Sequence, residues 1–172
     1  QQAGHQPIAV VGGATGMIGD PSGKDTERQF LTLDKIEENT ATLAKQLSRF
    51  LDFEGDNKAL LIDNLSWTAP FSYLQWLRDV GKHFSVNYMM AKESVRHRLE
   101  DRSQGISYTE FSYMLLQAYD FAHLHHHYGC LVQAGGNDQW GNITAGIELV
   151  RRMYGHEVFG ITFPLLTTAS GE

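Results

Sequence analysis

Short apolar runs alternate along the chain with longer stretches in which apolar residues recur at helical spacing. The runs at 8–11, 59–62 and 130–134 have the length and composition of buried parallel strands. Between the first two runs, apolar or small residues recur at Ile36, Thr40, Leu43, Leu47, Phe50 and Leu51. This spacing predicts a helix that ends near residues 53–55. Strands alternating with helices predict an α/β fold built on a parallel sheet.

A second helix is predicted to begin at Ser107, which has capping-box spacing to Glu110. Tyr113, Gln117 and Asp120 follow at positions i, i+4 and i+7, so three hydrogen-bonding side chains share one face. That face can hold a polar small molecule. It can equally face the protein core, with its polar side chains hydrogen-bonded to neighbouring backbone groups. The spacing leaves both interpretations open.

Acids and amides follow each predicted strand. They are Asp20 after the first, Asp63 and Asn64 after the second, and Asn137, Asp138 and Gln139 after the third. Ligands of open parallel sheets bind outside the carboxyl ends of the strands, so we expect these residues to meet at one site. The helix that begins at Ser107 would form a wall of that site.

The segment 12–23 contains five glycines but has neither the dinucleotide-binding fingerprint nor the Walker pattern. Asp20 within it can pair with an ammonium group or close an Asx turn on Ser22. Lys24 and Arg28, one helical turn apart, can attract phosphates or lie on a solvated surface. From these residues alone, pairing with an ammonium group is favoured for Asp20, and a solvated surface is favoured for Lys24 and Arg28.

Asp138 follows the glycine pair 135–136 and is placed to cap a helix that runs through Ile143 and Leu149 to Arg152. An acid beside glycines at a strand end is also the usual partner of ribose hydroxyls. Spacing alone leaves the two interpretations equal.

The histidine-rich stretch 123–127 has no acidic or cysteine partner at metal-ligand spacing, so we expect exposed histidines at a helix end. The basic residues Lys92, Arg96, Arg98 and Arg102 alternate with acids, which favours a solvated helix face.

Composition narrows the class of protein. The 172 residues are 42% hydrophobic and carry a net charge of −6, which argues against a protein that coats nucleic acid. The one cysteine, Cys130, lies in an apolar run and predicts an inert thiol in reducing cytosol. No apolar stretch is long enough to span a membrane. The first residue is Gln1, and the chain ends after a turn-like segment, which suggests a piece of a longer protein.

Four strings together resemble the bacterial tyrosyl-tRNA synthetases, a family of class I aminoacyl-tRNA synthetases. They are GGATGMIGDPSGK at 12–24, GKHFSVNYMMAKESV at 81–95, ISYTEFSYMLLQAYDF at 106–121 and GGNDQWGNITAG at 135–146. The match covers nearly the whole chain, and the order and spacing of the strings agree with the family. The resemblance implies a Rossmann-like catalytic domain that activates tyrosine with ATP and transfers it to tRNA.

The resemblance also implies roles for individual residues. The tyrosine pocket would contain Asp20, Asn64, Trp67, Tyr113, Gln117, Asp120 and Gln133. Within it, Asp20, Tyr113 and Gln117 would hold the substrate ammonium group. Asp120 would contact the phenol hydroxyl, while Asn64 and Trp67 would support the pocket.

For the nucleotide, the resemblance implies that Gly136, Asp138 and Gln139 contact the adenylate ribose and the substrate. Lys24 and Arg28 would meet the pyrophosphate. ATP is then a substrate, accompanied by Mg²⁺, and neither a prosthetic group nor a protein-bound metal is expected.

The helical insertion through which family members dimerise corresponds roughly to residues 68–106, with Tyr108 close to it. The resemblance therefore implies a homodimer, and we expect it in the cytoplasm. The HIGH-type motif, the KMSKS-type loop and the tRNA-binding domain of the family would lie outside residues 1–172. We therefore expect the isolated segment to be inactive.

Three other functions are compatible with parts of this sequence. A tryptophanyl-tRNA synthetase shares the architecture, but the three polar residues on the helix after Ser107 fit a tyrosine site. A non-catalytic paralogue that binds RNA or a protein partner would keep the fold without the ATP motifs. A nicotinamide-dependent dehydrogenase is disfavoured because the glycine fingerprint fails.

Overall fold

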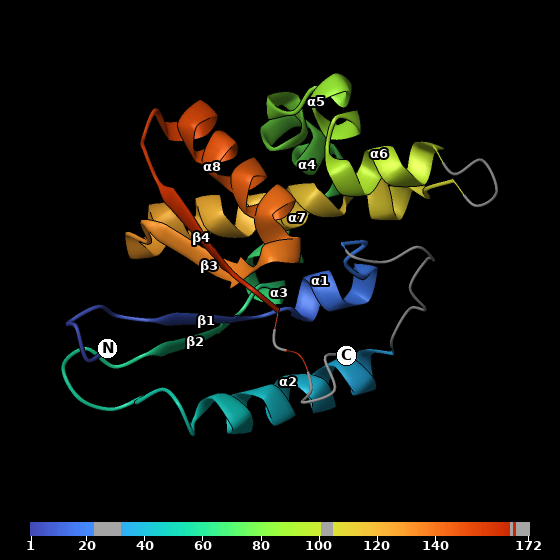
Figure 1. The fold of residues 1–172 in the computed structure, drawn as a ribbon. Helices are drawn as coiled ribbons and strands as arrows, with labels where there is room; N and C mark the ends of the chain where they lie inside the picture. The colour runs from blue at the N-terminus through green and yellow to red at the C-terminus, as the bar shows by residue number, and fades with distance from the viewer. Residues whose placement is uncertain (23–31, 101–104, 166, 168–172) are drawn as a thin grey trace. The chain divides into compact units, whose positions relative to one another are not determined.

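The computed structural model describes residues 1–22, 32–100, 105–165 and 167 (Figure 1). The chain divides into two compact units. Unit 1 comprises Gln1–Gly19 with Gln29–Pro70, and unit 2 comprises Asp20–Arg28 with Phe71–Glu172. The described residues form two parallel sheets of two strands each, one pair being β1–β2 and the other β3–β4. Among these residues no helix has the length and apolarity needed to cross a membrane.

Unit 1 is built on the parallel strands β1 (Ile8–Val11) and β2 (Leu60–Asp63). Their register pairs Ile8 with Leu60 and Val11 with Asp63. The prediction of the first strand is confirmed residue for residue, and the second begins one residue later than expected. The unit also contains three helices: α1 (Gly13–Ile18), α2 (Leu33–Leu47) and α3 (Leu65–Thr68).

Helix α1 lies where we expected only a glycine-rich loop, so that expectation was wrong. The Asp63 carboxylate accepts from the Gly13 backbone N–H at 3.0 Å, and Asn64 Oδ1 accepts from that of Ala14 at 2.8 Å. Two donors at the helix start are therefore satisfied by residues about fifty positions away, which local sequence cannot reveal. A Cβ at Gly13 would collide with the Asp63 carboxylate, so the close approach requires glycine.

Helix α2 (Leu33–Leu47) ends earlier than predicted. Thr32 caps it by accepting from the Lys35 backbone N–H at 3.3 Å, and its last residue is Leu47. Beyond it the chain turns, since the Phe50 N–H bonds to the Leu47 carbonyl at 2.9 Å. Phe50 is 83% exposed, so this residue contributes no packing that would stabilise a longer helix. The predicted end at residues 53–55 was therefore wrong.

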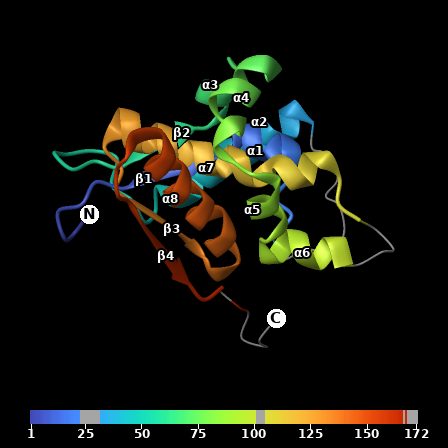
Figure 2. The ribbon, with the colours of Figure 1, turned by 90° about the horizontal axis from the view of Figure 1, so that it is seen from above.

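From Phe71 onward, unit 2 contains a segment of short helices and then two long helices that alternate with two parallel strands. Its elements are α4 (Tyr73–Asp79), the 3₁₀ turn η1 (Gly81–His83), α5 (Val86–Met90), α6 (Glu93–Glu100), α7 (Tyr108–Tyr128), β3 (Val132–Gly136), the 3₁₀ turn η2 (Asn137–Gln139), α8 (Trp140–Tyr154) and β4 (Phe159–Phe163). Figure 1 shows α8 packed against α7 and against the strands β3 and β4, and Figure 2 shows the same group from above.

Helix α8 connects the parallel strands β3 and β4, which pair from Val132 with Phe159 to Gly136 with Phe163. A parallel pair needs such a crossover. We predicted the third strand at 130–134, two residues too early, and did not predict β4. Cys130 lies just before β3, and burial raises the pKa of its thiol, which keeps it in the unreactive protonated form.

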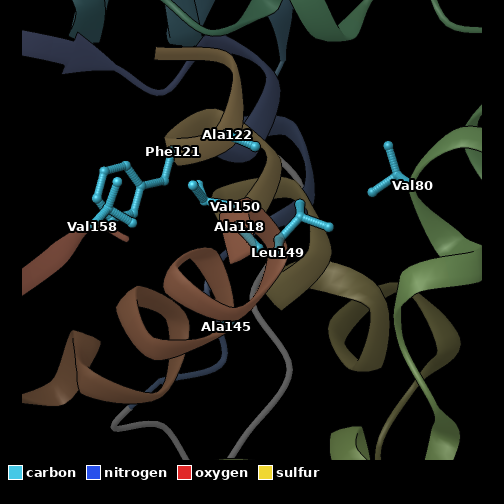
Figure 3. Close-up of a cluster of buried hydrophobic side chains, with 8 residues drawn as sticks. All are labelled: Val80, Ala118, Phe121, Ala122, Ala145, Leu149, Val150 and Val158. Carbon is cyan, nitrogen blue, oxygen red and sulfur yellow. The ribbon is translucent and has the colours of Figure 1, made fainter. Parts of the chain in front are cut away.

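The core of unit 2 lies between α7 and α8 and is drawn in Figure 3. Phe121, Leu149 and Val150 are fully buried there. Gly146 lets the two helices approach closely, because a Cβ at this position would lie 3.0 Å from two carbons of Phe121. The helix that carries Tyr113 and Asp120 is therefore held against α8 by close packing.

We expect Gly146→Ala to destabilise the protein by about 1–3 kcal/mol, because the added methyl group overpacks the contact with Phe121. Gly141→Ala on the same helix is the matched control. Its added Cβ would meet only Lys92 Cδ, at 3.9 Å, so the better helix propensity of alanine should stabilise it by up to about 1 kcal/mol. Urea unfolding of both variants measures the difference, and equal effects would contradict the close-packing interpretation.

The expected solvated basic face is wrong for two of its residues. Arg98 is 3% exposed and donates to both carboxylate oxygens of Glu110, at 2.9 and 3.3 Å. Lys92 is half-buried, donates to Thr144 Oγ1 at 2.9 Å and lies 4.5 Å from the centre of the Tyr88 ring. The alternation of charges did not show that these two cations have tertiary partners.

Candidate functional site

The polar face of α7 is formed as the spacing predicted. Ser107 Oγ accepts from the Glu110 backbone N–H at 3.2 Å, which starts the helix at the expected residue. Tyr113 is 7% exposed and Asp120 is 5% exposed, while Gln117 is half-buried. Burying a carboxylate is costly unless hydrogen bonds or charges compensate for lost water. A buried acid that shares a face with a buried phenol and an amide is therefore typical of a recognition site.

Asp20 lies at the centre of a hydrogen-bond network within unit 2. Its Oδ1 accepts from the Ser22 backbone N–H at 2.9 Å, which is the Asx turn considered from the sequence. Its Oδ2 accepts from Gln139 Nε2 at 2.8 Å. The structure thus brings together Asp20 and Gln139, which are 119 residues apart and follow two different strands.

Asn142 also belongs to this network and was missed by sequence reasoning. It is 6% exposed, and its Nδ2 lies 3.2 Å from Gln139 Oε1 and 3.3 Å from Ser22 Oγ. The available signal was its spacing, because an amide three residues after Gln139 lies on the same side of a helix that starts there.

Asp138 does not cap α8, so that interpretation was wrong. The helix begins at Trp140, its N-cap residue is Gln139, and no side chain makes a capping bond. Asp138 instead lies in η2, where its Oδ2 accepts from Gln139 Nε2 at 3.1 Å. The chain inserts a 3₁₀ turn before the helix, and this leaves the Asp138 side chain exposed and available as an acceptor.

Gly136 and Gln133 lie on β3. A Cβ at Gly136 would approach Asp138 Oδ1 to 2.5 Å and Leu165 Cδ2 to 2.7 Å, so the position has no room for a side chain. Gln133 Oε1 is buried and has no hydrogen-bond partner within the described ranges. An unpaired buried acceptor costs free energy, so it is a place where a ligand N–H or O–H would be stabilising.

Asn64 and Trp67 belong to unit 1, where they are 1% and 7% exposed. Asn64 joins β2 to α1: besides accepting from Ala14, it donates to Thr15 Oγ1 at 3.1 Å. The meeting of this group with Asp20 and Gln139 stays a prediction. Lys24 and Arg28 lie outside the described residues.

The histidines lie in the last turns of α7, with His126 and His127 exposed. In the described part of the chain, no three side chains of the metal-binding types gather closely enough to hold an ion. His126 stacks on Tyr154 with ring centres 5.1 Å apart, and His125 Nε2 lies 2.9 Å from His156 Nδ1. These contacts join the end of α7 to the end of α8.

Burial lowers the pKa of His123 to about 4, with smaller contributions from His127 and His126. The folded protein therefore binds fewer protons here than the unfolded chain between pH 6.5 and about 4. We expect stability to fall as the pH decreases through this window. In His123→Phe the dependence should be weaker, as measured by urea midpoints from pH 7 to pH 4.5. His5→Phe, which replaces an exposed histidine of unit 1, should leave the slope unchanged; an identical slope in His123→Phe would contradict the assignment.

Comparison with known proteins adds independent findings. The model of the family "tRNA synthetases class I (W and Y)" matches residues 1–172. A tyrosine-tRNA ligase of Rhodopirellula baltica is 63% identical over 172 residues, covering all of this chain and 39% of that protein. One of Geobacillus stearothermophilus is 59% identical, covering 99% of this chain and 41% of that protein. The chain thus spans about two fifths of the length of these curated relatives.

Solved structures agree on the fold. A C-terminally truncated mitochondrial tyrosyl-tRNA synthetase of Aspergillus nidulans superposes with a TM-score of 0.85 at 28% identity, covering 98% of this chain and 54% of that one. The Pyrococcus horikoshii tyrosyl-tRNA synthetase, crystallised with L-tyrosine, has a TM-score of 0.61 at 17% identity, covering 92% of this chain and 42% of that one. The predicted α/β fold of Rossmann type is confirmed. The chain belongs to the class I tRNA synthetase family of the tryptophan and tyrosine enzymes.

Proposed function

We propose that this protein is a tyrosine-tRNA ligase, which uses ATP to convert L-tyrosine to tyrosyl-adenylate and then transfers the tyrosyl group to tRNA(Tyr). The observation that carries the proposal is the polar face of α7, where the buried Asp120 shares a helix face with Tyr113 and Gln117. The names of the relatives support the same choice of amino acid.

The tyrosine pocket has two polar ends in this proposal. Asp120 accepts a hydrogen bond from the phenol hydroxyl of the substrate, and its burial makes the loss of that hydrogen bond costly. Asp20, Tyr113 and Gln117 hold the ammonium group, with Asp20 as the counter-charge. Gln133 adds its unpaired buried oxygen to the pocket.

Asn64 and Trp67 act as supports in the proposal. Asn64 is already engaged in fixing α1 to β2, which suits a residue that positions a loop. Asn64 is also the N-cap residue of α3, and the buried Trp67 supplies apolar packing to that helix.

The ribose of the adenylate contacts Gly136, Asp138 and Gln139. The absence of a side chain at Gly136 lets the Asp138 carboxylate lie close to the strand end, and this exposed carboxylate can accept from two sugar hydroxyls. Lys24 and Arg28 neutralise the pyrophosphate. Mg²⁺ enters with the ATP phosphates, as is usual for an ion that keeps several waters, and no prosthetic group takes part.

In the activation step, the carboxylate of tyrosine attacks the α-phosphorus of ATP and pyrophosphate leaves. The tRNA hydroxyl then takes the tyrosyl group from the adenylate. Neither step needs a covalent bond to the enzyme, so the residues of this chain act by positioning the substrates and stabilising charge.

The proposed enzyme is a homodimer. In the proposal, residues 68–106 form a helical insertion of the catalytic domain, and this segment contains α4, η1, α5 and α6. Leu74 is 76% exposed and Tyr108 is 64% exposed, while the Tyr73 and Tyr108 hydroxyls lie 3.4 Å apart. Exposed apolar groups of this size favour a protein interface, so we propose a homodimer. The single cysteine supports a reducing compartment, and we propose that the dimer acts in the cytoplasm. The HIGH-type motif, the KMSKS-type loop and the tRNA-binding domain would come from other parts of the polypeptide.

The test is ATP–pyrophosphate exchange by the natural full-length polypeptide that carries this sequence, with tyrosine, phenylalanine and tryptophan supplied separately. We expect exchange with tyrosine and background rates with the other two. Exchange driven by tryptophan would overturn the choice of substrate. Absence of exchange with every amino acid from a folded sample would instead favour a non-catalytic paralogue.

A further inference from the structure

Asn142 has no role in the proposed binding of tyrosine or ATP, yet its side chain touches three groups of the candidate site. Its Nδ2 lies 3.2 Å from Gln139 Oε1, 3.3 Å from Ser22 Oγ and 3.5 Å from Asp20 Oδ1. The residue is 6% exposed, so water cannot easily replace these contacts. A buried amide whose partners all belong to one network is placed to orient that network.

The orientation of Gln139 depends on this contact. Gln139 Nε2 donates to Asp20 Oδ2 at 2.8 Å and to Asp138 Oδ2 at 3.1 Å. Carboxylates only accept, so the NH₂ group of Gln139 must face them and its Oε1 must face a donor. Asn142 supplies that donor. Asn142 thus acts together with the two carboxylates: without it, Gln139 Oε1 would lose this donor, and the side chain would be held less firmly in its position against Asp20.

The position of Gln139 affects the orientation of the Asp20 carboxylate. Its Oδ2 is held by Gln139, and its Oδ1 is held by the Ser22 N–H, with Asn142 at the limit of hydrogen-bond distance. A carboxylate has about four acceptor positions, so these donors fix its rotamer and still leave capacity for a substrate cation. A displaced Gln139 would remove one of these donors and leave Asp20 less well oriented.

We propose that Asn142 is a positioning residue: it holds the Gln139 amide with its NH₂ toward Asp20 and thereby keeps Asp20 oriented to accept the ammonium group of the amino acid. This inference deepens the proposed function and rests on it. Asn142 touches neither substrate, and its effect is transmitted by Gln139.

The test compares ligands with and without an ammonium group. Tyramine and 3-(4-hydroxyphenyl)propionate serve as competitive inhibitors of tyrosine in pyrophosphate exchange by the full-length polypeptide. In Asn142→Leu, we expect the inhibition constant of tyramine to rise about 10-fold, which is the change expected when a hydrogen bond to a charged group is weakened. The constant of the propionate, which lacks the ammonium group, should change less than about twofold. A residue with a merely structural role would weaken both ligands equally, and that result would overturn the proposal.

Two further variants complete the test. Thr144→Val removes a hydrogen-bonding side chain of α8 that faces Lys92 instead of the site, and it should change neither inhibition constant. Adding Asn142→Leu to Gln139→Ala should cost no further affinity for tyramine, because residues that act in series are not additive. Full additivity would overturn the transmission through Gln139.

Failure of the proposal is distinguishable from failure of the proposed function. If the unsubstituted protein catalyses no tyrosine-dependent exchange, the function itself is wrong. If it does, the inhibition constants decide the role of Asn142 alone. Asn142→Ser provides a smaller change in case the leucine variant does not fold. Loss of the fold in both variants would show that the amide serves the structure and would also overturn the proposal.

Discussion

Replacing Asp120 with alanine in the full-length polypeptide is expected to remove most of the proposed preference for tyrosine over phenylalanine. Asp120 is 5% exposed, so phenylalanine would leave its carboxylate buried without the phenol partner. Sites built to bond a substrate hydroxyl reject the analogue that lacks it by about 10⁴–10⁵-fold, and tyrosyl-tRNA synthetase is itself the known example of such discrimination. With the carboxylate gone, this penalty on phenylalanine disappears.

The measurement is kcat/KM for pyrophosphate exchange with each amino acid. We expect the value for tyrosine to fall by at least about 10²-fold, as for loss of a buried hydrogen bond to a charge, while the value for phenylalanine stays level or rises. Glu100→Ala, which removes an exposed acid of α6, should change neither value. An unchanged ratio of the two constants in Asp120→Ala would show that another group recognises the phenol.

Breaking the ion pair between Arg98 and Glu110 is expected to give the largest loss of stability. Their side chains are 4% and 2% exposed, and Arg98 Nε also donates to the Gly105 carbonyl at 3.0 Å. Arg98→Met would leave the Glu110 carboxylate buried without its counter-charge. Removing one partner of a buried pair costs about 3–5 kcal/mol, and urea unfolding of the variant measures it.

The neighbouring pair of Arg96 and Glu100 provides the control on the same helix. It is 3.9 Å long with side chains 65% and 71% exposed, so Arg96→Met should cost at most about 1 kcal/mol. The double variant Arg98→Met, Glu110→Leu should recover much of the lost stability, because no unpaired charge remains. Equal costs for the two single variants would contradict the difference in burial.

Local signals in the sequence were sufficient where an element depends on its own residues. The strand at 8–11 and the start of α7 at Ser107 were predicted correctly, since a β-branched run and a capping serine act within a few positions. The three polar residues on one face of α7 follow from helix geometry alone. The hypothesis of a polar site on this helix therefore needed only residues that are close together in the chain.

Other features could not be predicted, because their causes lie far away in sequence. Helix α1 starts where Asp63 and Asn64 supply acceptors to its backbone, and no local pattern at 12–18 indicates this. Helix α2 stops at Leu47 although its apolar spacing continues, because Phe50 finds nothing to pack against. Arg98 looked like one of several surface cations, and only its contact with Glu110 shows otherwise.

The sequence by itself determined the α/β class and the family, because periodicity, capping and long motif strings are properties of neighbouring positions. It also supplied, through the family resemblance, the residues of the proposed tyrosine site. Only the tertiary structure decided which polar groups meet. It joined Asp20 to Gln139 and revealed Asn142 as their common partner, because a hydrogen bond between residues 119 positions apart depends on packing that no short stretch of sequence contains.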